Sequence, residues 1–296
     1  MFDIKSFYEA KDVKDAVRAL VNDPDAEIIS GGTDVLIRVR EGKDAGKSLV
    51  SIHNIKELKG VKVLPEGDIF IGAGTSFSHI TNDPTIKEKI NMLGEAVDTV
   101  GGPQIRNTGT IGGNICNGAT SADSASTMWT LNAELVLEGP EGERIVPINE
   151  FYTGPGKTVR DRCEVCKGFI IRKENFEGWY GRYIKYGKRN AMEIATLGCA
   201  VRVKLSEDKN NIEDVRLAYG VAGPTPLRCH KAEAAVRGRA VDDPELYEIF
   251  ASEALTEVNP RSSWRASKEF RLQLIEELCK RALKDAIKLA GGEADA

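Results

Sequence analysis

The start of the chain alternates apolar stretches with polar turns in a pattern that predicts a small mixed unit. Apolar side chains recur at helical spacing in two stretches, and two short apolar runs have the length and flanking residues of buried strands. We therefore expect residues 1 to about 55 to form a subdomain of their own. Its predicted elements are a helix at 12–21 behind Asp12 as N-cap, a strand at 27–29, a helix at 35–39 and a strand at 49–52.

A second unit, residues 56–176, carries apolar runs that are typical of strands. Two pairs of these runs are separated by Pro, Gly, Glu and Asp residues at 65–68 and 139–142, which predict hairpin turns. A final apolar run closes the unit before the polar and aromatic segment 174–180. The predicted strands are 61–64, 69–72, 135–138, 144–147 and 166–171.

The remainder, residues 177–296, predicts a small sheet followed by helices. Strand patterns occur at 183–186, 198–205 and 215–221, and the stretch 264–290 repeats apolar residues at helical spacing with few breakers. The expected fold class is therefore α+β. The two domains are expected at 1–176 and 177–296.

Composition excludes several classes of protein. The chain of 296 residues is 41% hydrophobic and 29% charged, and 41 basic against 45 acidic residues give a formal net charge of −4. This balance argues against a nucleic-acid binder. No run approaches the roughly 18 apolar residues of a membrane span, and the first residues lack the pattern of a signal peptide. We expect no membrane partner, a cytoplasmic location and six reduced cysteines.

The first candidate site is the pair of glycines in Ser30–Asp34, between a predicted strand and a predicted helix. Glycine lets backbone N–H groups approach an anion closely. Successive N–H groups at the start of a helix form a cradle for phosphate. A simple strand-to-helix turn is the alternative, because paired glycines are common in turns.

The second candidate is the polar stretch Gly101–Asp123. Its 23 residues include six glycines, three asparagines and three threonines, and its centre is Gly109–Asn114. This composition disfavours a helix or a central strand. We predict an extended loop that wraps a polar ligand with backbone and short polar groups. A ligand-free surface loop of this length is the less common alternative.

Side chains for catalysis or metal binding are scarce. The three histidines form no cluster, and the pair Cys163 and Cys166 lacks the further ligands that zinc needs. We interpret these cysteines as ordinary thiols, and Lys185, on spacing alone, as an exposed strand residue. No catalytic residue and no metal site are expected, so a cofactor has to carry any redox chemistry.

Taken together, these motifs resemble the FAD-binding medium subunit of the molybdenum hydroxylases. The two glycine motifs carry the resemblance, which extends over nearly the whole chain. Within that family the chain is similar to the FAD-binding subunits of bacterial xanthine dehydrogenases. Further matching segments are 102–107, 117–125, 151–158 and 260–271.

The resemblance implies a fold and a set of cofactor contacts. Residues 1–176 would be a two-subdomain FAD-binding domain of the vanillyl-alcohol oxidase and cresol methylhydroxylase type, followed by the C-terminal domain of these flavoproteins. Lys185 would lie close to the isoalloxazine ring, Asp123 would lie near the cofactor, and Val165 or Cys166 would contact FAD through the backbone. The pyrophosphate and ribityl chain would be held by Ile28, Ile29, Ser30, Gly31, Gly32, Thr33, Asp34, Val35, Gly109, Thr110, Ile111, Gly112, Gly113 and Asn114.

The resemblance also implies an electron-transfer function. A [2Fe-2S] small subunit would supply electrons from a molybdopterin large subunit, and NAD would be the acceptor. The first glycine motif holds no histidine, so FAD is expected to bind non-covalently. Two alternatives stay open: a stand-alone FAD-dependent oxidase or reductase, and a non-catalytic module that binds a phosphate ligand.

Overall fold

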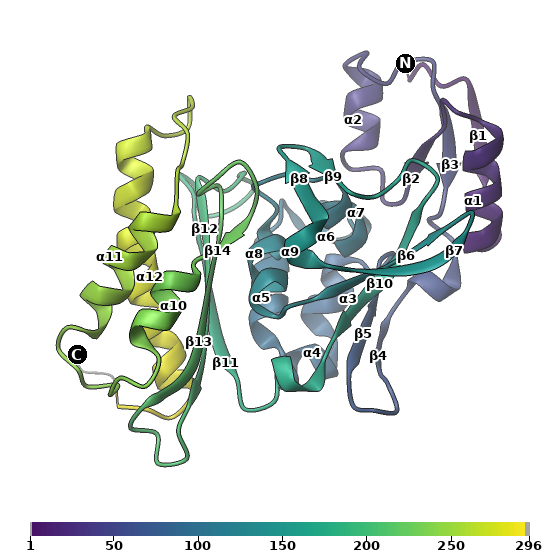
Figure 1. Ribbon diagram of the computed structural model, residues 1–296. Coiled ribbons are helices and arrows are strands. Elements are labelled where there is room, and N and C mark those ends of the chain that lie inside the picture. Colours follow the sequence, from purple (N-terminus) through teal and green to yellow (C-terminus); the bar gives the residue numbers. More distant parts are fainter. Residues whose placement is uncertain (1, 294–296) are drawn as a thin grey trace.

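The structure is a computed structural model that describes residues 2–293 (Figure 1). Its first unit is a three-stranded parallel sheet in the order β1 (Ser6–Glu9), β3 (Ser48–Ser51), β2 (Glu27–Ile29). Helix α1 (Val13–Asn22) begins where the Asp12 side chain accepts from the Asp15 N–H at 2.7 Å, as predicted. Helix α2 (Val35–Arg40) follows β2, so the helices and strands predicted for this part of the chain are confirmed.

The second unit is built on a five-stranded antiparallel sheet. Its order is β4 (Val61–Val63), β5 (Ile69–Gly72), β10 (Val165–Ile171), β6 (Glu134–Gly139), β7 (Gly142–Pro147). Both predicted hairpins are present, since β4 pairs with β5 and β6 with β7. The smaller elements are the 3-10 helices η1 (Lys56–Leu58) and η2 (Lys173–Asn175), α9 (Ile148–Phe151), β8 (Tyr152–Gly154) and β9 (Lys157–Thr158).

Six short helices connect β5 to β6 and lie between the five-stranded sheet and the C-terminal sheet (Figure 1). Their apolar side chains form one core with the inner face of the five-stranded sheet. The helices are α3 (Phe77–Asn82), α4 (Pro84–Lys89), α5 (Asn91–Asp98), α6 (Pro103–Thr108), α7 (Ile111–Cys116) and α8 (Asp123–Thr130).

The C-terminal unit is an antiparallel meander covered on both faces. Helices α5 and α8 pack on one side of it, and the C-terminal helices cover the other (Figure 1). Because both faces are covered, eight of the nine residues of strand β12 (Leu197–Leu205) are buried. Its elements are β11 (Tyr180–Tyr186), β12 (Leu197–Leu205), β13 (Ile212–Gly220), β14 (Leu227–Arg228), α10 (His230–Val236), α11 (Leu246–Glu257) and α12 (Lys268–Leu289).

The extended loop predicted for Gly101–Asp123 is wrong, because α6 and α7 lie within it. Pro103 occupies the first turn of α6, where its missing N–H costs nothing. The Thr110 hydroxyl accepts from the Gly113 N–H at 3.2 Å and caps α7. The cap on α7 thus outweighs the low helix propensity of Gly112 and Gly113, and the other four glycines of the stretch lie outside the two helices.

The remaining predictions concern the last helix, membrane-spanning helices and the domain boundary. The helix predicted from residue 264 begins later, because the Ser267 side chain caps α12 by accepting from the Phe270 N–H at 3.2 Å. Within the described residues, no helix combines the length and the apolarity that crossing a bilayer requires. The domain boundary at residue 176 stays a prediction.

Candidate functional site

The two glycine motifs, about 80 residues apart in sequence, meet in the structure. A Cβ atom on Gly31 would lie 1.9 Å from the carbonyl oxygen of Thr108 and 3.1 Å from the Cα of Gly109. Only glycine therefore allows this approach. The next residue, Gly32, has φ of +73°, a conformation that favours glycine as well.

The first motif presents unsatisfied hydrogen-bond donors at this junction. Among residues 2–293, the backbone N–H groups of residues 31–34 donate to no protein group. The Ser30 hydroxyl is buried and has no hydrogen-bond partner. A buried hydroxyl is normally paired, and successive free N–H groups before a helix suit an anion, so this concentration of donors fits a ligand such as a diphosphate.

The second motif, Gly109–Asn114, differs from the expected cradle, because five of its six N–H groups already have protein partners. The Ile111 N–H donates to Thr75 O at 3.1 Å, and the Gly112 N–H donates to Ala73 O at 2.8 Å. A Cβ on Gly112 would lie 2.6 Å from the Cβ of Ala73. Gly112 therefore allows close packing of α7 on the segment after β5, and this packing fixes the wall that faces the first motif.

Lys185, predicted close to the flavin ring, and Asp123, predicted near the cofactor, form a buried ion pair. The Lys185 ammonium lies 2.8 Å from the Asp123 carboxylate, and their side chains are only 11% and 7% exposed. Lys185 also donates to Thr99 O at 3.0 Å, and the Tyr183 hydroxyl donates to Asp123 at 2.9 Å. The exposed lysine expected from spacing alone is therefore wrong.

The electrostatics of this pair follow from its burial. Burial raises the pKa of Asp123, while Lys185 and then Tyr183 act in the opposite direction. Burial and the neighbouring Asp123 also raise the pKa of Tyr183 well above its ordinary value. The site therefore offers a neutralised pair with fixed donors, with Tyr183 holding its proton, and not an isolated cation.

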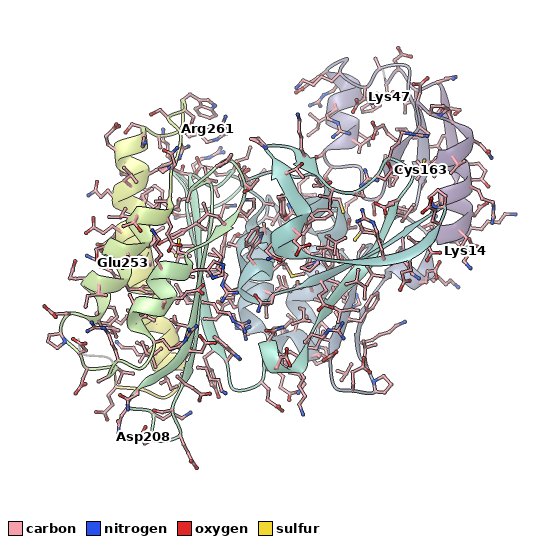
Figure 2. The ribbon with its side chains drawn as sticks, in the orientation of Figure 1. Lys14, Lys47, Cys163, Asp208, Glu253 and Arg261 are labelled. Carbon is pink, nitrogen blue, oxygen red and sulfur yellow. The ribbon has the colours of Figure 1, made fainter. Side chains whose placement is uncertain are left out.

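Cys163 and Cys166 do not act together. Cys163 packs into the core of the first unit, where Figure 2 shows it, and Cys166 packs into the core beneath α7. Cys166 pairs instead with Cys116: a hydrogen bond to that thiol and burial raise the pKa of Cys166 well above its ordinary value. Val165 is also fully buried, and its side chain packs into the core of the first unit.

The segment between α7 and α8 is held from two sides, which the sequence alone did not indicate. Gly118 has φ of +68°, and a Cβ there would lie 2.8 Å from the Lys157 N. On the other side, the Val221 N–H donates to Thr120 O at 3.0 Å. Val221 itself has φ of +68°, a strained conformation for a β-branched residue. Such strain persists only where the surroundings fix the backbone.

Metal ligation is not evident in this region. Among residues 2–293, no three His, Cys, Asp or Glu side chains gather as metal ligands do. The unpartnered donors of the first motif and the buried pair from β11 and α8 are what the chain offers a ligand. The donors follow β2 of the first unit, Asp123 begins α8 of the second unit, and Lys185 lies on β11 of the C-terminal sheet.

Comparison with known proteins agrees with this geometry. Residues 2–171 match the family described as "FAD binding domain in molybdopterin dehydrogenase", and residues 182–286 match the "CO dehydrogenase flavoprotein C-terminal domain". The chain is 42% identical over 293 residues to the putative xanthine dehydrogenase FAD-binding subunit of Escherichia coli strain K12, covering 99% of each chain.

More distant relatives bear the names of other enzymes. The carbon monoxide dehydrogenase medium chain of Hydrogenophaga pseudoflava is 30% identical, covering 95% of this chain and 96% of that one. A solved structure of carbon monoxide dehydrogenase from the same organism matches with a TM-score of 0.90 at 29% identity, over 97% and 98% of the two chains. Both domains and the full-length relatives agree: the chain belongs to the FAD-binding medium subunits of the molybdenum hydroxylases.

Proposed function

We propose that this chain carries electrons through non-covalently bound FAD, from a [2Fe-2S] small subunit to NAD. A molybdopterin large subunit of the same complex would hydroxylate a purine or another N-heterocycle. The 42% identity to a putative xanthine dehydrogenase FAD-binding subunit supports the purine class. A relative named as the nicotinate dehydrogenase FAD-subunit of Eubacterium barkeri supports an N-heterocycle more broadly.

One observation carries the proposal: the unpartnered donors of residues 30–34 lie at the point where Gly31 meets Thr108. Residues 28–35 would bind the pyrophosphate and ribityl chain of FAD. Residues 109–114 would shape the facing wall, and the backbone of Val165 or Cys166 would line the groove. No side chain of this set has to gain or lose a proton, because their task is to bind and orient.

Lys185 and Asp123 would lie beside the isoalloxazine ring. Two of the three ammonium protons of Lys185 are used by Asp123 and Thr99 O, which leaves one donor for a ligand. When bound, FAD supplies the chemistry by accepting single electrons and releasing them as a pair. The lysine and its carboxylate partner would set the local field in which this occurs.

The acceptor and the partners are tested on two preparations. The isolated chain is loaded with FAD, photoreduced without oxygen and mixed with NAD⁺ or with oxygen. We expect NAD⁺ to reoxidise the flavin faster, with NADH as product. A tagged chain purified from its native cells should bring down two further chains that contain iron and molybdenum.

Other outcomes point to the alternatives. An isolated chain that oxidises an organic substrate without partners would be a stand-alone flavoenzyme. A chain that shows no flavin absorbance and gains none with added FAD would contradict the proposal altogether. Faster reoxidation by oxygen than by NAD⁺ would leave the subunit role intact and change the acceptor.

A further inference from the structure

Helix α8 is bonded at both ends to the C-terminal sheet. Its first residue, Asp123, accepts from Tyr183 and Lys185 of β11. At its last residue, the Thr130 carbonyl accepts from Arg216 of β13 at 2.9 Å. A single eight-residue helix thus connects Arg216 to the pair at the candidate flavin site.

Arg216 is costly to bury where it lies. It is 8% exposed and stands directly opposite Arg202 in the register of β12 and β13. Among residues 2–293, neither arginine forms an ion pair with a carboxylate, so two like charges face each other in the interior. Burial, with the neighbouring Arg216 as the second cause, lowers the pKa of Arg202 to about 9.

Two interactions offset this cost. The Arg216 guanidinium lies 4.2 Å from the centroid of the Trp179 ring, a favourable position over an aromatic face. It also meets the C-terminal end of α8, where unpaired carbonyls carry partial negative charge. The Arg216 Nε atom has no hydrogen-bond partner. The hydrogen bond of this side chain is the one that it donates to the Thr130 carbonyl.

Helix α8 can transmit this contact because it is tightly bonded within itself. The Thr130 hydroxyl donates to Thr127 O at 2.8 Å, and the Thr127 hydroxyl donates to Ser124 O at 2.7 Å. The Ser124 hydroxyl in turn donates to Asn114 of the second glycine motif at 2.7 Å. A shift of α8 along its axis would therefore displace Asp123 and disturb the contact with Asn114 together.

We propose that Arg216 is a positioning residue for the flavin site, fixing the register of α8 and thereby the placement of the Asp123–Lys185 pair. This inference rests on the proposed function. It assigns to Arg216 an influence on bound FAD that it exerts without touching FAD. It differs from a purely structural role in predicting an effect on flavin properties.

Arg202 provides the matched control. It is also buried, 2% exposed against 8% for Arg216, stands opposite Arg216 and lies 5.5 Å from the same Trp179 ring. Its hydrogen bond, however, goes to the carbonyl of Asn175 in η2 and not to α8. Removing either guanidinium should cost similar stability, but only one of them holds the flavin-site helix.

The experiment compares Arg216→Met and Arg202→Met in the full chain, each loaded with FAD. We expect both variants to lower the melting temperature, and only Arg216→Met to shift the flavin reduction potential. The same variant should weaken FAD binding by about tenfold, within the usual range of site-to-site coupling. Combined with Asp123→Asn, it should add little further shift, because both act through the same pair.

Three results would overturn the inference. These are an unchanged flavin potential in Arg216→Met, an equal shift in Arg202→Met, or full additivity with Asp123→Asn. If the methionine variant does not fold, Arg216→Lys carries the same test, with an expected smaller shift of the same sign. A wild-type chain that binds no FAD would contradict the proposed function instead, so the two failures are distinguishable.

Discussion

At the scale of single residues, Gly31 has the most direct consequence for the site. A Cβ atom there would overlap the Thr108 carbonyl at 1.9 Å, and both atoms belong to backbone that cannot simply turn aside. Gly31→Ala should therefore separate the two motifs. We expect a loss of about 1–3 kcal/mol in the free energy of unfolding and a much weaker affinity for FAD.

Urea denaturation and a titration that follows flavin fluorescence measure these two effects. Gly154→Ala is the control, because a Cβ on Gly154 meets nothing within 4 Å and its φ lies outside the left-handed region. It should change stability by no more than about 0.5 kcal/mol. Equal behaviour of the two variants would refute the close contact between the motifs.

The sequence identified candidate residues better than it predicted their burial and their contacts. Ser30–Asp34 was singled out because glycines at a strand-to-helix turn have a local signature. Lys185 had none: only the resemblance placed it near a flavin, while spacing alone suggested an exposed strand residue. Its burial depends on Asp123, which tertiary packing brings to it from helix α8. Tyr183, on the same strand as Lys185, donates to the same carboxylate.

At the scale of elements, the strands were predicted well and the short helices poorly. Strands β5, β6 and β10 are apolar runs between clear turn signals, so local pattern suffices for them. The six helices between β5 and β6 have at most eight residues each, too few to be stable alone. Their formation depends on caps and on packing against two sheets, which the local pattern does not reveal.

The connection of β7 to the start of β10 gives a prediction at this scale. Arg144 of β7 holds Glu164 with two hydrogen bonds, at 2.5 and 2.9 Å. These bonds, ahead of the opposing effect of burial, lower the pKa of Glu164. A lowered carboxyl pKa stabilises the fold above the unfolded value of about 4.3, and this stability is lost as the pH falls through the folded pKa.

Glu164→Gln should therefore destabilise the protein by about 1–2 kcal/mol at pH 7, a range kept small because Arg144 is 46% exposed. The difference from wild type should shrink as the pH falls below about 4.3. Urea denaturation across this pH range measures it. Glu143→Gln, whose carboxylate is 46% exposed beside Lys167, should have a smaller effect. A constant difference at all pH values would contradict the assignment.

At the scale of the whole molecule, the proposed FAD site would draw on three sheet units. The unpartnered N–H groups follow β2 of the first unit, the facing wall belongs to the second, and Lys185 comes from the C-terminal sheet. Arg261, labelled at the top of the C-terminal unit in Figure 2, lies in the loop that precedes α12. No local pattern specifies how these units are arranged, so only the resemblance to a known family predicted that residues of all three lie at one cofactor.

This arrangement predicts that the two halves of FAD are sensed by different parts of the chain. ADP carries the diphosphate but lacks the flavin ring. It should slow hydrogen exchange only in peptides that cover residues 28–36, where the unpartnered N–H groups lie. FAD should slow exchange there and also around Thr99 and Lys185, because the ring would rest against the buried pair.

Hydrogen exchange followed by mass spectrometry separates these cases, with helix α11 as an internal control because it lies on the far face of the C-terminal sheet (Figure 1). FAD should in addition raise the melting temperature, since a ligand at about 100 times its dissociation constant stabilises the folded state by about 2.7 kcal/mol. Protection of the Lys185 region by ADP alone would mean that the diphosphate, and not the ring, lies beside the Asp123–Lys185 pair, which would reverse the orientation proposed for the cofactor.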